Sequence, residues 1–352
     1  MDTETGESWF RQGRQRVPAR EWRAVGAPRQ LAYPAARVAA IAVTAIGSFA
    51  MHLSGAWFIG SALTHDVLTL TQARWLWVVG LASASFFAGH TGAIGLLDAH
   101  SQQRVRLPEG LPETSQDAQR ARNPWAVAAQ SLGVWGGLAA ALGVAFSPRW
   151  WPNGVHLMQF AWQFAAASAL LSGVVVAQHT GQRFLAEARL APERRRFSGS
   201  FNAYLWQRHA LPQGVVNTLL NGLVGVAIAP VALNQSVALV PASFIQRDAL
   251  GTGLLLTLVI AGGVRAYTRF ESRWGVAPVP REPERRTGSL PMLGLLVASS
   301  AAALLGLTQV PALSAWTFIV SRAIGCGVWS AIVAYWVACL TVRRAMLIED
   351  AS

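Results

Sequence analysis

The chain has 352 residues, of which 53% are hydrophobic and 13% are charged, and its formal net charge is +12. Between residues 38 and 246, five stretches of at least 23 residues contain no Asp, Glu, Lys or Arg, whereas one crossing of a bilayer needs about 20 residues. This composition excludes an ordinary soluble domain and predicts an all-α, polytopic integral membrane helix bundle. The two cysteines belong to no CxxC or Cys/His cluster, so no zinc or iron–sulfur site is expected.

The basic charge consists of 29 arginines, and the chain has no lysine. In a soluble protein this charge would suggest nucleic-acid binding, because clustered arginines neutralise phosphates. Here the arginines lie next to apolar runs, where they orient helices and attract anionic lipid headgroups. We therefore expect this protein to interact with the anionic headgroups of the lipid bilayer. We do not expect it to bind nucleic acid.

The first half of the chain begins with residues 1–37, which carry seven arginines and four acidic residues. This composition is typical of an Arg-rich cytoplasmic segment lying against the membrane surface. Residues 38–178 follow as the first group of four transmembrane helices. Their expected ranges are 38–60, 75–97, 125–146 and 156–178.

The second half begins with an Arg-rich cytoplasmic linker at 179–210, in which apolar residues recur at helical spacing and predict a helix lying on the membrane surface. Residues 211–342 hold the second group of four transmembrane helices, and 343–352 form a cytoplasmic tail. The expected spans are 211–230, 249–264, 290–308 and 314–342. The apolar residues 231–246 between the first two of them fit a loop, an interfacial segment or a partial re-entrant.

The distribution of arginines predicts the orientation of these spans. Twenty-five of the 29 arginines lie in every second hydrophilic segment, three lie on the other side, and one lies inside a span. The positive-inside rule then puts both termini on the cytoplasmic side of a bacterial plasma (inner) membrane. A chain with both ends on one side crosses the membrane an even number of times, and about eight spans satisfy this condition. Two groups of four spans also allow a parallel four-plus-four internal repeat.

Arg322 is the arginine that lies inside a span, about nine residues or 13 Å from its outer end. An unpaired cation is costly at that depth. Asp248, at the start of the short sixth span on the same side, is the best candidate partner. Arg322 therefore either contacts an anion or substrate, or pairs structurally inside the bundle.

Two pairs of amides have the i, i+4 spacing that puts them on one face of a helix. Asn217 and Asn221 lie in the fifth span, and Gln159 and Gln163 lie in the fourth. Such stripes either hydrogen-bond between helices or line a polar cavity that recognises a substrate.

His52 and His90 are the histidines well inside spans, and paired histidines on neighbouring helices can ligate haem b. Their estimated heights above the cytoplasmic end differ, at about 21 Å and about 12 Å. We therefore expect no cofactor, and we count both as candidate cavity residues. Small residues around His90 favour close helix packing instead.

Motifs of catalysis are not found: the sequence has no Walker A pattern, HExxH, GxSxG or His-box array. The leading expectation is a transporter-like or permease-like protein that binds or passes a small molecule or lipid through a polar cavity. The alternative is a non-catalytic membrane subunit or scaffold that docks a cytoplasmic or membrane protein partner. A membrane enzyme or haem-binding protein ranks third, so an enzyme is not the favoured class.

Overall fold

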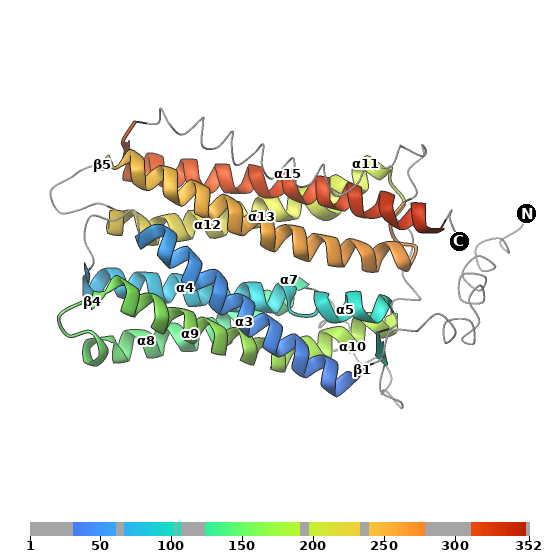
Figure 1. Ribbon diagram of the computed structural model, residues 1–352, viewed down its shortest axis with the longest axis horizontal. Helices are drawn as coiled ribbons and strands as arrows, with labels where there is room; N and C mark the ends of the chain where they lie inside the picture. The colour runs from blue at the N-terminus through green and yellow to red at the C-terminus, as the bar shows by residue number, and fades with distance from the viewer. Residues whose placement is uncertain are drawn as a thin grey trace, which may run out of the picture.

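The computed structural model describes residues 31–60, 67–102, 104–106, 124–190, 197–232, 239–278 and 311–349. In these ranges the chain is helical apart from short turns and two-residue strands, and the helices lie roughly along one common direction (Figure 1). Within the described residues seven helices are long and apolar enough to cross a membrane. They are Tyr33–Ala56, Leu70–Ser101, Trp125–Trp150, Leu157–His179, Phe201–Ala229, Ala242–Arg273 and Ala315–Arg344.

The first half of the bundle is built around α4, which packs against α7 and α8 on one side and α9 on another. Helix α4 begins with a capping box, in which the Thr69 hydroxyl accepts from the backbone of Gln72 and the Gln72 side chain accepts from the backbone of Thr69. An aromatic core of Trp77, Phe160 and Phe164 joins α4 to α9. The elements are α3 (Tyr33–Gly60), α4 (Leu70–Thr91), α5 (Ile94–Ser101), α7 (Pro124–Ser131), η1 (Leu132–Gly136), α8 (Gly137–Trp150), α9 (Leu157–Val175), η2 (Val176–Thr180) and α10 (Gly181–Leu190).

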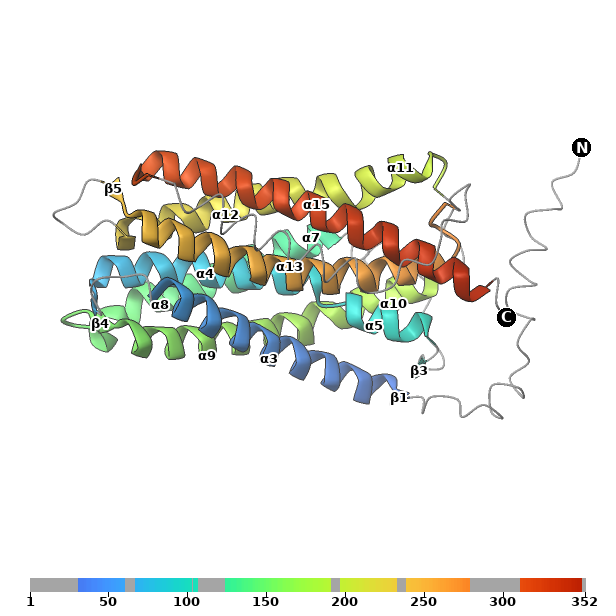
Figure 2. The ribbon, with the colours of Figure 1, turned by 45° about the horizontal axis from the view of Figure 1, so that its top comes forward.

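The second half centres on α15, which packs against both α12 and α13. Helices α12 and α15 approach closely because both carry glycine at the crossing, as small residues allow in membranes. The backbone of Gly327 lies against Gly214 and Thr218. Figure 2 shows this group beside the first half, with α4 between α9 and α12. The elements are α11 (Phe201–Tyr204), η4 (Leu205–Ala210), α12 (Leu211–Ala232), α13 (Ala242–Arg273) and α15 (Ala315–Glu349).

Three two-residue strand pairs join the loops of the bundle. A parallel pair, β1 (Leu31–Ala32) with β3 (Val105–Arg106), lies at one end. At the opposite end (Figure 1) are two antiparallel pairs. Strand β2 (Val67–Leu68) pairs with β4 (Val155–His156), and β5 (Leu239–Val240) pairs with β6 (Leu313–Ser314). Each antiparallel pair therefore joins the starts of two helices in the same half, α4 to α9 and α13 to α15.

The seven expected spans that fall within the described residues each match a helix, with one main difference in length. The sixth span, expected at 249–264, is the 32-residue helix α13, which runs from Ala242 to Arg273. Hydropathy alone ends the span at Asp248 and Arg265, but the helix continues through both. Asp248 is buried against Arg322, and Arg265 is exposed on the side of the helix. Residues 242–246 accordingly form the first turns of α13 and not a re-entrant loop. The expected span 290–308 lies outside the described residues.

The helix expected to lie on the membrane surface within 179–210 has a different position. Helix α9 continues through the π-helical segment η2 into α10, so α10 extends a transmembrane helix. The Phe184 ring stacks on Tyr33 of α3 at 5.4 Å, and Arg183 and Glu187 are also buried. This segment is therefore packed into the bundle, and its short apolar stripe faces other helices.

Candidate functional site

Arg322 of α15 forms a buried ion pair with Asp248 of α13. Its Nε donates to Asp248 Oδ2 at 2.8 Å and its Nη2 donates to Asp248 Oδ1 at 3.3 Å. Two parallel bonds of this kind are the strong, geometrically specific form of an arginine–carboxylate contact. The side chains are 7% and 3% exposed, so the pair that the sequence predicts is present inside the helix bundle.

The remaining donors of Arg322 are also bound by the protein. Nη2 donates to Thr252 Oγ1 at 3.1 Å, and Nη1 donates to Asn221 through both its backbone oxygen, at 2.8 Å, and its Oδ1, at 3.0 Å. A guanidinium has five N–H groups, and these bonds give an acceptor to each one. Arg322 of α15 is thus fully hydrogen-bonded by two neighbouring helices, α12 and α13, and its charge is balanced by Asp248.

Local helix geometry places the partners of Arg322. Asp248 and Thr252 are four residues apart on α13, so both side chains face α15, and the Thr252 hydroxyl donates to Asp248 Oδ1 at 3.2 Å. On α12 the amide nitrogens of Asn217 and Asn221 each donate to the carbonyl four residues earlier at 2.9 Å. These bonds orient the Asn221 amide and leave its Oδ1 for Arg322.

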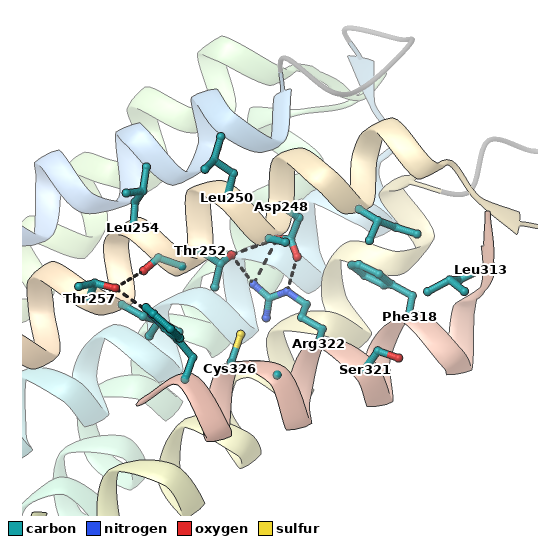
Figure 3. Close-up of a pocket in the computed structure, with 16 residues that line it drawn as sticks. Asp248, Leu250, Thr252, Leu254, Thr257, Leu313, Phe318, Ser321, Arg322 and Cys326 are labelled. Atoms are coloured by element: carbon teal, nitrogen blue, oxygen red, sulfur yellow. Dashed lines mark hydrogen bonds and ion pairs between the residues drawn. The ribbon is translucent and has the colours of Figure 1, made fainter. Parts of the chain in front are cut away.

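A cavity of about 320 Å³ lies between α13 and α15 beside this pair (Figure 3). Asp248 and Arg322 form its charged wall, and the rest is mainly apolar. Trp329 and Thr257 also line the cavity, and the Trp329 indole donates to Thr257 Oγ1 at 2.8 Å. Further lining residues include Leu250, Leu254, Leu313, Phe318, Ser321 and Cys326. An apolar hollow with a few convergent polar groups is the usual form of a small-molecule site.

Gln159 and Gln163 do not join this site. Both are exposed side chains of α9, and Gln163 Oε1 accepts a hydrogen bond from the Trp151 indole at 2.8 Å. The glutamine stripe therefore lies on the outside of the described bundle. Of the two amide stripes, the one on α12 reaches Arg322, through Asn221, while Asn217 is fully buried behind it.

The structure places His52 and His90 in separate surroundings. His52 lies eight residues before the end of α3, where its Nδ1 is 2.7 Å from the Ser48 carbonyl oxygen and its ring contacts Phe164. His90 lies twenty residues into α4, with its ring 4.4 Å from that of Trp125. At 1.5 Å per residue, His52 lies about 12 Å before the end of α3 and His90 about 30 Å after the start of α4. They neither face each other nor line the cavity.

Small residues near His90 provide the close helix packing that the sequence favours. The Ser131 side chain of α7 fills the space where a Cβ on Gly89 would lie, and Ser85 does the same at Gly136. Among the described residues, no group of three or more His, Cys, Asp or Glu is arranged to hold a metal ion.

Sequence reasoning missed a buried polar cluster at the other end of α13. The Tyr204 hydroxyl donates to Glu271 Oε2 at 2.7 Å, and His209 Nε2 lies 3.7 Å from the same oxygen. Nearby, Asp98 forms an ion pair with Arg269. Because these charges lie beyond the uncharged runs, hydropathy assigns them to loops, although Glu271 is fully buried in α13.

No protein-family model matches this chain, and neither a curated protein nor a solved structure gives a match. The seven apolar helices make it a multi-pass membrane protein. Any more specific function has to be argued from the geometry of the Arg322 site and its cavity.

Proposed function

We propose that this chain is a transporter-like membrane protein that binds or passes a small molecule or lipid in the cavity between α13 and α15. The observation that carries this proposal is the buried Arg322–Asp248 pair in the wall of an apolar cavity of about 320 Å³. Ionisable residues within transmembrane segments are rare and typically mark substrate or ion pathways. The cavity also has the size and lining of a small ligand site.

We infer that the chain crosses a bacterial inner membrane eight times, with both termini on the cytoplasmic side. The positive-inside rule supports the orientation. Two equivalent strand pairs, β2–β4 and β5–β6, support a parallel repeat, since each joins the second and fourth span of its half. Helix pairs α3–α9 and α12–α15 are equivalent in the same way. A span at 290–308 completes the second half.

The arginine-rich end of the bundle is expected to contact anionic lipid headgroups. Arg208, Arg265 and Arg273 belong to helix segments at the end that carries β1 and β3. Each cation near an anionic surface contributes about 1 kcal/mol of attraction. This contact supports the orientation and is independent of what the cavity binds.

The two native cysteines provide a test of the cavity. Cys326 lines the cavity, whereas Cys339 is 5% exposed inside an apolar cluster of α15. A small, water-soluble methanethiosulfonate reagent should therefore modify Cys326 in native membranes much faster than Cys339. The variants Cys326→Ser and Cys339→Ser assign the label to each position.

Equal and negligible modification of both thiols would contradict the proposal. It would mean that the space beside Arg322 is dry and filled by protein. The non-catalytic subunit or scaffold, with a cytoplasmic or membrane protein partner, would then be the better description.

A further inference from the structure

We propose that the ligand of this cavity is uncharged and mainly apolar, carrying at most a hydroxyl-sized polar group, and that the site discriminates against anions such as carboxylates and phosphates. The inference rests on the proposed function, because it names the substrate class of the same cavity. An arginine within the membrane would ordinarily be expected to bind an anionic ligand, and this inference differs from that expectation.

The first step is the hydrogen bonding of Arg322. Each of its five N–H groups donates to an acceptor on Asp248, Thr252 or Asn221. An anion that took the paired Nε and Nη2 bonds of the guanidinium would have to displace Asp248. That exchange would leave a carboxylate 3% exposed and without its cation, which is the costly outcome of breaking a buried pair.

The second step concerns the other donors in the cavity wall. The Thr252 hydroxyl donates to Asp248, the Thr257 hydroxyl donates to the Gly253 carbonyl at 2.7 Å, and the Trp329 indole donates to Thr257. These groups therefore offer an anion no hydrogen. Ser321 and Cys326 are the remaining polar side chains in the described lining, and neither is a cation.

Asp248 retains some capacity to accept a hydrogen bond. Its Oδ1 accepts from Arg322 and Thr252, whereas the described contacts give Oδ2 a single donor, Arg322 Nε. A carboxylate has about four acceptor positions. A hydroxyl on the ligand can therefore donate to Asp248, which favours an alcohol over an acid of the same chain length.

The third step compares the two halves of the bundle. Superposing β2–β4 on β5–β6 pairs Val67 with Leu239 and His156 with Ser314. Continuing along the helices residue by residue puts Phe164 at the position of Arg322, and Gly80 at the position of Thr252.

Phe164 occupies that equivalent position with an apolar ring. The ring lies against Gly80, so closely that a Cβ there would overlap it, and it packs on Trp77 with ring centroids 6.2 Å apart. The first half thus has an aromatic ring between α4 and α9 at the position where the second half has Arg322 beside its cavity. An apolar ligand in that cavity would give the second half the apolar packing that the first half has without a ligand.

The experiment uses the purified full-length chain in lipid nanodiscs and follows the rate at which Cys326 is modified, with Cys339 as the internal reference. Three probes with the same alkyl chain are compared at alkaline pH: 1-dodecanol, dodecanoate and dodecyl phosphate. We expect dodecanol to slow the modification of Cys326 roughly tenfold at about ten times its Kd. Neither anion should slow it at the same concentration.

The variant Asp248→Asn removes the carboxylate that occupies Arg322 and should let dodecanoate slow the modification. Leu254→Trp, which fills the cavity, should abolish the effect of dodecanol. If Asp248→Asn does not fold, the comparison of the three probes on the unmodified chain decides alone.

Each remaining outcome has one meaning. Slowing by dodecanoate or dodecyl phosphate equal to that by dodecanol would overturn the substrate class while leaving the proposed function intact. Rapid modification of Cys326 that no probe slows would also overturn it. An unreactive Cys326 without any probe would instead contradict the proposed function itself.

Discussion

Arg322 remains charged inside an apolar helix bundle because the surrounding protein replaces every hydrogen bond that water would give it. The carboxylate of Asp248 supplies the counter-charge, and Asn221 and Thr252 supply neutral acceptors. The stabilisation gained by such a pair is small compared with the cost of losing one partner, because the other partner is then left buried and charged.

Reversing the charge of one partner removes the pairing and should therefore be strongly destabilising. We expect Asp248→Arg and Arg322→Asp each to lower the free energy of unfolding by about 3–5 kcal/mol. The double swap restores opposite charges at the same distance and should recover a large part of that loss. The measurement is denaturant unfolding of the purified protein, and losses that simply add in the double variant would show that the two residues do not interact.

The sequence locates Arg322 and Asp248 because charges are conspicuous within apolar runs. It does not identify Thr252 or the Asn221 carbonyl, since their role depends on how α12 and α13 turn toward α15. The same limit explains the glutamines. Gln159 and Gln163 have the spacing of Asn217 and Asn221, but spacing shows only that two residues share a helix face and not which way that face points.

At the scale of elements, close packing of α12 on α15 holds the Arg322 side of the bundle together. A Cβ at Gly327 would overlap Thr218 Oγ1 and lie 2.9 Å from the Gly214 carbonyl oxygen. Backbone atoms cannot rotate away as a side chain can, so the helices would have to separate.

Gly327→Ala should accordingly cost about 1–3 kcal/mol of stability. Gly325→Ala is the matched control, because it lies on the same helix and its Cβ would have no atom within 4 Å. Both substitutions gain the same helix propensity, so the difference between them isolates the packing. Thermal unfolding monitored by circular dichroism measures it, and equal melting temperatures would argue against close contact of α12 with α15.

Hydropathy predicts the existence of these helices better than their ends. Uncharged runs identify α3, α4, the α7–α8 segment, α9 and α12 because apolar length is what a bilayer requires. Hydropathy misses the ends of α13 because charge alone marks Asp248 and Glu271 as loop, whereas Asp248 is paired with Arg322 and Glu271 accepts a hydrogen bond from Tyr204 inside the bundle. Helix α10 was assigned to the surface because charged residues interrupt its apolar stripe, although Arg183 and Glu187 are buried.

At the scale of the whole molecule, the arginine distribution predicts which end of the bundle faces the cytoplasm. In a chain with Cys326→Ser and Cys339→Ser, a cysteine placed at Asn153 should react with an impermeant maleimide in intact cells. A cysteine at Ser198 should react only after permeabilisation. Both positions are exposed, and they lie at opposite ends of the bundle. The reverse pattern would invert the topology.

For the proposed four-plus-four repeat, the sequence offers only a count of four expected spans in each half. Residue identity between the halves is weak, because lipid-facing and packing positions accept many apolar residues. The registers of β2–β4 and β5–β6 give the correspondence that the residues do not. They also show where the halves differ, with Phe164 in one and Arg322 in the other.

The β5–β6 pair has a mechanical consequence for the cavity. It fastens the starting ends of α13 and α15 to each other through Leu239 with Ser314 and Val240 with Leu313. Two helices that are joined at one end can separate only by rotating about that end, so the distance between them increases with distance from the strand pair. Small rotations would leave the surroundings of Leu313 almost unchanged and would move Trp329, further along α15, by the larger amount.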